Sequence, residues 1–230
     1  MTALGRMIDV TASDGHVLAA YIAGDPDASG SVVVVQEVFG VNAHIRSVVD
    51  RYAELGYLTI APALFDRVER GVDLDYTDTG MKTGFAVRDR IDWATTPLDV
   101  SAGIEHVRRA RPVGLVGFCY GGGVAWRCAH ELRLDAVVAY YGGQISQFID
   151  RAPQCPILLH FGASDHMIPA GDIDDIRMAY PDIPVHVYPG AGHGFNCDIR
   201  ASYDPKASAL AQERTEAFFE TYMSAGRLRG

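Results

Sequence analysis

Short apolar runs rich in β-branched residues recur along the chain and alternate with longer stretches of mixed polarity. Ser31–Gln36 is the most apolar of them, and an unbroken run of this kind is typical of a strand buried on both faces. The other runs that predict strands are Tyr57–Ala61, Pro112–Gly117, Ala136–Tyr140, Pro156–His160 and Pro184–Tyr188.

The segments between these runs are long enough for crossover helices, which we expect at Ala43–Leu55, Pro97–Ala110, Gly122–Glu131 and Gly171–Tyr180. Strands that alternate with helices predict an α/β fold, in which a mostly parallel central sheet carries helices on both faces in a three-layer sandwich. With no internal repeat, low-complexity tract or long linker, we expect a single domain over residues 1–230.

The two ends of the chain have patterns of their own. Met7–Ala23 predicts two shorter strands joined by a hairpin turn at Ser13–His16. Near the other end, Pro205–Ser224 predicts a last helix that docks on the sheet through a stripe of apolar side chains, namely Ala209, Leu210, Phe218 and Phe219.

Composition narrows the classes of partner. The chain has 20 Lys and Arg against 29 Asp and Glu, for a net charge of −9, so it lacks the broad basic face that nucleic acid or an anionic membrane selects. We therefore expect a small-molecule partner, no nucleic acid, no membrane, and a monomer or weak homo-oligomer. Neither a membrane span nor a secretory leader is visible, and the cytoplasm is the expected location.

The cysteines and glycines indicate neither a metal nor a cofactor. The four cysteines, Cys119, Cys128, Cys155 and Cys197, have neither zinc-site nor disulfide-framework spacing, so we expect free thiols. His160, Asp165 and His166 lack a ligand pattern, and no metal is expected. Gly121–Gly123 does not have the G-x-G-x-x-G spacing of a dinucleotide site, and we expect no cofactor.

One strand is followed by the pattern of a nucleophile elbow. Gly117-Phe-Cys119-Tyr-Gly121 has the G-x-S-x-G spacing with Cys in place of Ser, between a predicted strand and a predicted helix. The glycines suit a tight junction where side chains would clash, and a helix N-terminus at Cys119 favours a thiolate. The alternative interpretation is a buried structural cysteine beside a glycine-rich turn.

Two later strand ends carry the residues that such a nucleophile needs. Asp165 follows the strand at Pro156–His160, and His193 follows the strand at Pro184–Tyr188, in the order nucleophile, acid, base that the elbow expects. Taken alone, Asp165 suits a turn or a helix cap, and a single histidine is usually structural. Three matches in order favour a catalytic triad, because loops at the carboxyl ends of parallel strands gather on one edge.

At this point the sequence resembles the dienelactone hydrolase family of the α/β-hydrolase fold, over nearly the whole chain. The segments that carry the resemblance are Gln36-Glu-Val-Phe-Gly-Val-Asn42, Gly117-Phe-Cys-Tyr-Gly-Gly-Gly123, Tyr140-Tyr-Gly-Gly143, Asp165-His-Met-Ile-Pro169 and Gly192-His-Gly-Phe195. The resemblance implies a carboxylic ester hydrolase that cleaves a small lactone or ester through a thioacyl intermediate on a Cys119–His193–Asp165 triad.

The resemblance also implies two features around the nucleophile. It places Glu37 close to Cys119, where substrate binding displaces the glutamate and helps a neutral thiol become a thiolate. It assigns the oxyanion hole to the backbone N–H groups of Val38 and Tyr120, the second of which also follows from the elbow. From the residues alone, a carboxylate at the end of an apolar strand needs a partner, and a structural hydrogen bond to a loop is the alternative for Glu37.

The candidates for substrate binding are Lys82, Arg200, Phe39 and Tyr141. The family holds a substrate carboxylate with arginines, but here Lys82 stands at one expected position and Cys197 at the other, with Arg200 three residues further on. Solvent exposure is the alternative for Arg200, and core packing is the alternative for the two aromatic residues. We expect Asp66–Ile91 to form a loop and short helix over the site, or else an ordinary solvated crossover.

Two other functions remain open. One is a general carboxylesterase or thiol peptidase that uses the same triad on uncharged substrates. The other is a non-enzymatic hydrolase-fold protein, for redox sensing or binding, in which Cys119 is oxidised rather than acylated. The spacing of the cysteines identifies no resolving thiol for the redox alternative.

Overall fold

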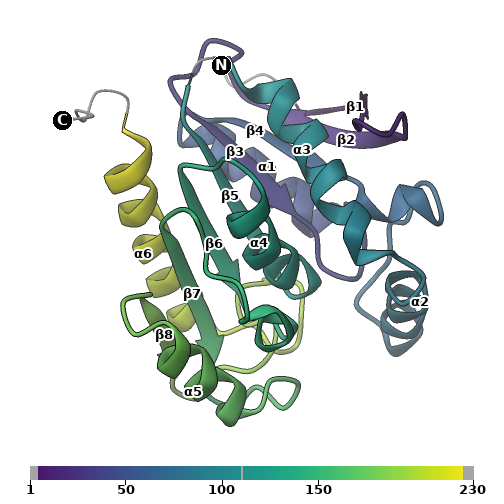
Figure 1. The fold of residues 1–230 in the computed structure, drawn as a ribbon. Helices are drawn as coiled ribbons and strands as arrows, with labels where there is room; N and C mark the ends of the chain where they lie inside the picture. Colours follow the sequence, from purple (N-terminus) through teal and green to yellow (C-terminus); the bar gives the residue numbers. More distant parts are fainter. Residues whose placement is uncertain (1–4, 110, 225–230) are drawn as a thin grey trace.

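The computed structural model describes residues 5–109 and 111–224, which form an eight-stranded sheet flanked by helices (Figure 1). The strands are β1 (Arg6–Thr11), β2 (Val17–Ala23), β3 (Ser31–Val35), β4 (Leu58–Pro62), β5 (Val113–Phe118), β6 (Ala136–Tyr140), β7 (Ile157–Gly162) and β8 (Val185–Tyr188). Their order across the sheet is β1-β2-β4-β3-β5-β6-β7-β8. The pairs β1–β2 and β2–β4 are antiparallel, and the remaining pairs are parallel.

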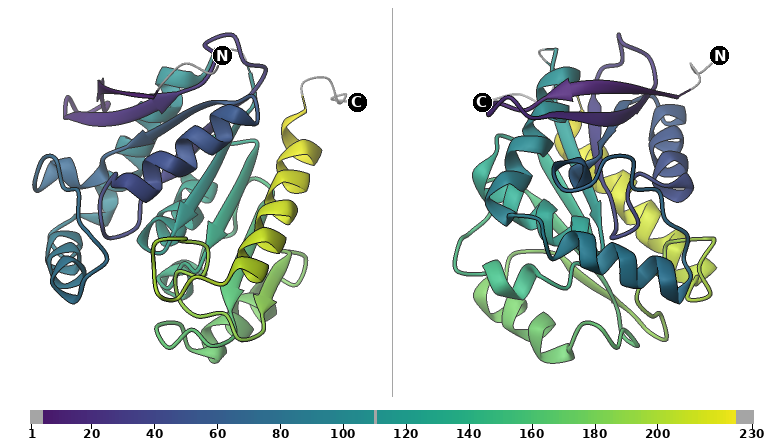
Figure 2. Two further views of the ribbon diagram at one scale, coloured as in Figure 1. Left: turned by 180° about the vertical axis from the view of Figure 1, so that it is seen from behind. Right: turned by 90° about the vertical axis from the view of Figure 1, so that its right-hand side faces the viewer.

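Helices cover both faces of this sheet. The helices are α1 (Ala43–Glu54), α2 (Asp78–Arg88), α3 (Thr96–Val107), α4 (Tyr120–Glu131), α5 (Ala170–Ala179) and α6 (Pro205–Met223), with short 3-10 turns at Leu64–Arg67, Trp93–Thr95 and Ile145–Phe148. The view from behind in Figure 2 brings α1 and α6 in front of the sheet, whereas α3 and α4 lie on the opposite face. The predicted α/β fold, with a mostly parallel sheet between two helical layers, is confirmed.

The apolar runs predicted the central strands well because these strands are buried on both faces. β3, β4, β5, β6 and β7 contain only buried residues, β6 has the predicted ends, and the ends of the other four differ from the predicted ones by at most two residues. The helix predicted at Pro97–Ala110 is seen as Thr96–Val107, and Ala110 lies outside the described residues, as do the two ends of the predicted domain. Within residues 5–109 and 111–224, no helix combines the length and apolar character needed to cross a membrane.

Of the four residues in the stripe predicted for the last helix, Phe219 is buried as expected, and the other three are not. Ala209 and Leu210 are exposed and Phe218 is half-buried, whereas the residues of α6 that face the sheet are Ala207, Ser208, Ala211, Thr215, Phe219 and Met223. The buried row follows the four-residue repeat of a helix face and contains polar side chains, which an apolar pattern overlooks. They are tolerated there because they are hydrogen-bonded, Ser208 to Asn196 and Thr215 to Tyr140.

The junction of β5 and α4 brings two backbones into direct contact. A Cβ atom on Gly117 would overlap the carbonyl oxygen of Gly121, and one on Gly121 would overlap the carbonyl oxygen of Val35 and lie 2.6 Å from that of Gln36. Between the two glycines, Cys119 has φ 55° and ψ −115°, a strained conformation for a residue with a side chain. The glycines therefore serve close packing, and the strain falls on the cysteine.

We expect Gly117→Ala to lower the free energy of unfolding by roughly 1–3 kcal/mol, because the new methyl group meets backbone that cannot move aside. Gly171→Ala is the matched control. Gly171 lies in α5 with nothing within 4 Å of the added Cβ, so this change should raise stability by about 0.4–1 kcal/mol. Urea unfolding followed by circular dichroism measures both, and equal stabilities for the two variants would contradict the packing argument.

Candidate active site

Cys119 lies at the end of β5 and forms the N-cap of α4. Its backbone N–H donates to the carbonyl of Tyr140 at 3.0 Å, and the residue is only 7% exposed. The sulfur therefore sits at the N-terminal end of a helix, where the partial positive charge of the helix stabilises a negative charge. The carboxyl ends of the parallel strands converge on this edge of the sheet (Figure 1).

His193 and Asp165 form a hydrogen-bonded pair at the same edge. Asp165 follows β7, His193 follows β8, and His193 Nδ1 donates to Asp165 Oδ2 at 2.8 Å. The other carboxylate oxygen accepts from the backbone N–H of Met167 at 2.8 Å, which fixes the orientation of Asp165. Among the described residues, His193 Nε2 is buried and has no hydrogen-bond partner. The imidazole is thus oriented through one nitrogen and leaves the other for chemistry.

The surroundings of His193 favour its charged form. Burial of the imidazole by itself lowers its pKa, but the attraction of a Cys119 thiolate and the hydrogen bond to Asp165 outweigh burial and raise the pKa to about 10. Tyr141 packs edge-on against the imidazole, with ring centroids 5.1 Å apart, and shields it from solvent. Once Cys119 has lost its proton, the arrangement suits a thiolate–imidazolium pair with a buried carboxylate behind it.

The oxyanion hole expected from the sequence would use two backbone amides. The N–H groups of Val38 and Tyr120 meet no acceptor within the part of the chain that the structure describes. The N–H of Gly121 donates to the carbonyl of Gln36 at 3.1 Å, which ties the segment after β3 to the first turn of α4. The segment that contains Val38 is therefore tied to the turn that contains Tyr120.

Glu37 is fully buried, and its carboxylate accepts hydrogen bonds from residues other than Cys119. Tyr76 Oη donates to Glu37 Oε2 at 2.8 Å, and Arg200 Nη1 donates to Glu37 Oε1 at 3.3 Å. Burial and the nearby carboxylate raise the pKa of Tyr76, so its hydroxyl keeps the proton that it donates. The Arg200 guanidinium also lies over the rings of Phe39 and Tyr76. Between Glu37 and Cys119 the structure records no hydrogen bond for the described residues.

A cavity of about 380 Å³ opens onto Cys119 and His193. The other residues of its wall are Phe85, Arg88, Gly143, Gln144, Ser146, Gln147, Met167, Ile168 and Asp172. The four predicted substrate-binding residues are not part of this wall. Lys82 is exposed on α2, Phe39 and Tyr141 are buried, and Arg200 donates a hydrogen bond to Glu37.

The charged residues of this wall were not identified from the sequence. Arg88 and Phe85 project from α2, and Asp172 from α5 accepts a hydrogen bond from Ser146 at 2.8 Å. A glycine in the sequence of α2, Gly84, could have pointed to Arg88 and Phe85, because it lies in the same part of this helix. A Cβ on Gly84 would overlap the carbonyl oxygen of Val38, so only glycine lets α2 approach the segment after β3 this closely. The predicted loop and short helix over the site therefore includes α2 as a wall of the cavity.

Comparison with known proteins agrees with this architecture. The model of the dienelactone hydrolase family matches residues 18–223. The carboxymethylenebutenolidases of Pseudomonas putida and Pseudomonas knackmussii are each 32% identical to this chain over 228 residues, covering 94% of it and 97% of their own length. A crystal structure of a provisionally assigned dienelactone hydrolase from Klebsiella pneumoniae has 31% identity and a TM-score of 0.78, over 95% of this chain and 100% of that one.

These similarities extend over nearly the whole chain and include the segments that contain Cys119, Asp165 and His193. The sheet order, the helices on both faces and the strained residue at the β5–α4 junction are those of an α/β-hydrolase fold. The chain belongs to the dienelactone hydrolase family of carboxylic ester hydrolases.

Proposed function

We propose that this protein hydrolyses a small lactone or carboxylic ester through a Cys119–His193–Asp165 triad and a thioacyl intermediate. The observation that carries the proposal is the His193–Asp165 hydrogen bond of 2.8 Å, in a cavity that Cys119 and His193 both line. A nucleophile, a base and a residue that orients the base are the parts that covalent acyl transfer needs.

In the first half of the reaction, the Cys119 thiolate attacks the carbonyl carbon and forms a carbon–sulfur bond. The negative charge moves to the carbonyl oxygen, where the N–H groups of Val38 and Tyr120 stabilise it. The carbon–oxygen bond then breaks, His193 gives its proton to the leaving alkoxide or enolate and becomes neutral, and a thioester remains on Cys119.

In the second half, water hydrolyses the thioester. Neutral His193 removes a proton from the water through Nε2, and the resulting hydroxide attacks the thioester carbonyl. The carbon–sulfur bond breaks, the carboxylic acid product leaves, and the thiolate is restored beside the imidazolium. Asp165 keeps the imidazole oriented through Nδ1 and stabilises its charged form throughout.

We assign to Glu37 the role of assisting formation of the thiolate. Its carboxylate is held by Tyr76 and Arg200 in the absence of substrate, so a substrate must free it before it can take the proton of a neutral Cys119 thiol. The carboxylate lies one residue before Val38, whose amide is assigned to the oxyanion hole, so a shift of this segment affects both groups.

The cavity supports a small substrate, and its wall offers one cation and one carboxylate. Arg88 suits a carboxylate on the substrate, as in the carboxylated lactones that the family resemblance implies, although it also donates to Asp89 at 2.9 Å and 2.6 Å. Asp172, which also lines the cavity, suits a hydrogen-bond donor on the substrate instead. An uncharged aryl ester is therefore the informative comparison for a carboxylated lactone.

We expect Cys119→Ala to reduce hydrolysis of both substrates by at least about 10⁴-fold, because no thioester can form. Cys155→Ser is the matched control, since Cys155 is a half-buried thiol outside the cavity, and it should keep wild-type rates. Mass spectrometry of a quenched reaction should detect the acyl adduct on the wild type. Equal activity of wild type and Cys119→Ala would contradict the triad, while activity on the uncharged ester alone would favour a general carboxylesterase.

A pH titration tests the thiolate–imidazolium pair. A Cys119 thiolate raises the pKa of His193 to about 10, whereas a neutral thiol exerts no such attraction. Because the role assigned to Glu37 requires a neutral thiol before substrate binds, the imidazole midpoint of the resting wild type should match that of Cys119→Ala. Nuclear magnetic resonance of the imidazole protons follows both titrations, and a wild-type midpoint near pH 10 that falls in Cys119→Ala would show a resting thiolate and remove the role assigned to Glu37.

Replacement of Glu37 by Gln should slow acylation by about 100-fold or more without unfolding the chain, because the amide cannot accept the thiol proton as a base. Glu69→Gln is the control, since Glu69 is an exposed residue whose contact with Arg90 is at 3.9 Å. Stopped-flow measurement of the burst phase separates acylation from deacylation. An unchanged burst rate in Glu37→Gln would remove this residue from the mechanism.

A further inference from the structure

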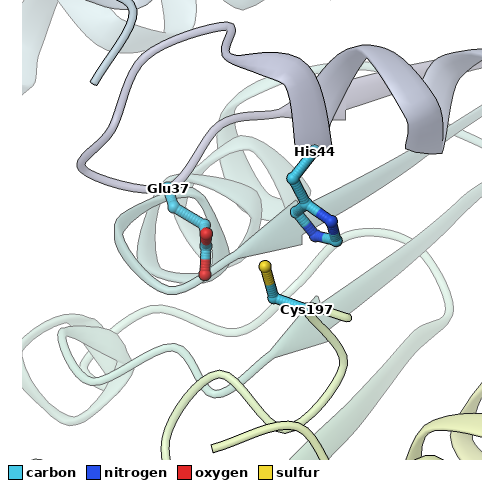
Figure 3. A group of neighbouring side chains, drawn as sticks. All are labelled: Glu37, His44 and Cys197. Atoms are coloured by element: carbon cyan, nitrogen blue, oxygen red, sulfur yellow. The ribbon is translucent and has the colours of Figure 1, made fainter. Parts of the chain in front are cut away.

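Three potential metal ligands from distant parts of the chain meet beside the active site. Glu37 follows β3, His44 lies in the first turn of α1, and Cys197 lies in the loop between β8 and α6. All three residues are buried, and their ligand atoms lie within 4.8 Å of one another. Figure 3 shows the carboxylate, the imidazole and the thiol pointing toward one another.

His44 gives an independent reason to expect a ligand here. The residue is only 4% exposed, yet neither of its ring nitrogens has a hydrogen-bond partner among the residues described. A buried nitrogen that has lost its hydrogen bond to water and gained no partner destabilises the fold by roughly 1–3 kcal/mol. Such a nitrogen therefore usually binds a protein group, a water molecule or an ion. In Figure 3 the imidazole faces Glu37 and Cys197.

The surroundings of the cluster are those of an outer shell around a metal. His44 Nδ1 lies 3.5 Å from Asp198 Oδ1, which leaves Nε2 for the other ligands. A carboxylate behind a histidine is the usual arrangement that orients a metal-bound imidazole. The Glu37 carboxylate is likewise held by donors, Tyr76 at 2.8 Å and Arg200 at 3.3 Å.

We propose that Glu37, His44 and Cys197 form a binding site for a zinc ion. Thiolate, imidazole and carboxylate are the three ligand types that Zn²⁺ takes in proteins, and a water molecule would fill the fourth position. Ligand atoms around tetrahedral zinc lie about 3–4 Å apart, so small side-chain rotations bring this set into place. The sequence shows no metal pattern because the ligands come from three separate segments.

The charge and the chemical type of the three ligands favour a divalent metal ion that binds sulfur well. Zinc binds the thiolate, so binding forms the zinc–sulfur bond and releases the thiol proton of Cys197 to water. The Cys197 thiolate and the Glu37 carboxylate then carry the two negative charges that match the charge of Zn²⁺. Arg200 repels a cation, so the harder Mg²⁺ and Ca²⁺, which gain little from sulfur, should bind poorly.

Zinc binding itself does not depend on the proposed function. Its effect on activity does, because a zinc-bound Glu37 is held on Cys197 and His44 and is withheld from Cys119. A carboxylate that coordinates zinc cannot accept the Cys119 proton. Under the proposed mechanism, zinc at this site would therefore inhibit the enzyme by slowing acylation.

The test uses the full-length Cys119→Ala variant, which removes the catalytic thiol as a competing ligand and makes the readout independent of activity. Titration calorimetry with Zn²⁺ should give one ion per chain, with a proton released in proportion. Adding Cys197→Ser or His44→Gln should abolish binding, and adding Asp198→Asn should weaken it by about 10–100-fold. Adding Cys155→Ser, which removes a thiol outside the cluster, should leave the affinity unchanged.

A spectroscopic readout avoids dependence on how well the variants fold. Co²⁺ added to Cys119→Ala/Cys155→Ser should produce a thiolate-to-cobalt charge-transfer absorption that Zn²⁺ then displaces. Absence of this absorption, absence of Zn²⁺ binding to Cys119→Ala, or an affinity that folded Cys197→Ser retains would each overturn the proposal. Far-UV circular dichroism identifies which variants are folded.

Discussion

The close contact between the backbones of β5 and α4 is the constraint on which the rest of the site depends. Gly117 and Gly121 permit a separation that any side chain would prevent, and the chain can turn between them only if Cys119 adopts a positive φ. This strain has a direct consequence for chemistry, because it presents the sulfur at the N-terminus of α4 and at the edge where the parallel strands end. The packing of the whole sheet maintains the conformation.

The segment after β3 links the nucleophile to the rest of the cavity. Its Gln36 carbonyl receives the N–H of Gly121, its Glu37 carboxylate reaches Tyr76 and Arg200, and its Val38 carbonyl lies against Gly84 of α2. Movement of this segment would therefore affect the elbow, the buried carboxylate and the wall that carries Arg88 together. The proposed roles of Glu37 and of the Val38 amide, and the proposed zinc site, all concern this one stretch of backbone.

The buried carboxylate of Glu37 is stabilised by donors from two distant segments of the chain. A carboxylate with no exposure needs donors, and the chain supplies a tyrosine hydroxyl from the segment before α2 and a guanidinium from the loop before α6. Cys197 stands where the family resemblance leads one to expect arginine, yet Arg200 reaches the carboxylate from three residues further on.

The sequence by itself determined the α/β class, the central strands and the order in which Cys119, Asp165 and His193 follow their strands. Apolar periodicity and glycine spacing record burial and backbone contact, which are local or nearly local properties. Only the tertiary structure decided the register of α6, the partners of Glu37, the cavity wall with Arg88 and Asp172, and the meeting of His44 with Cys197. These features depend on side chains from segments far apart in the chain, and no spacing within one segment encodes which distant groups will face each other.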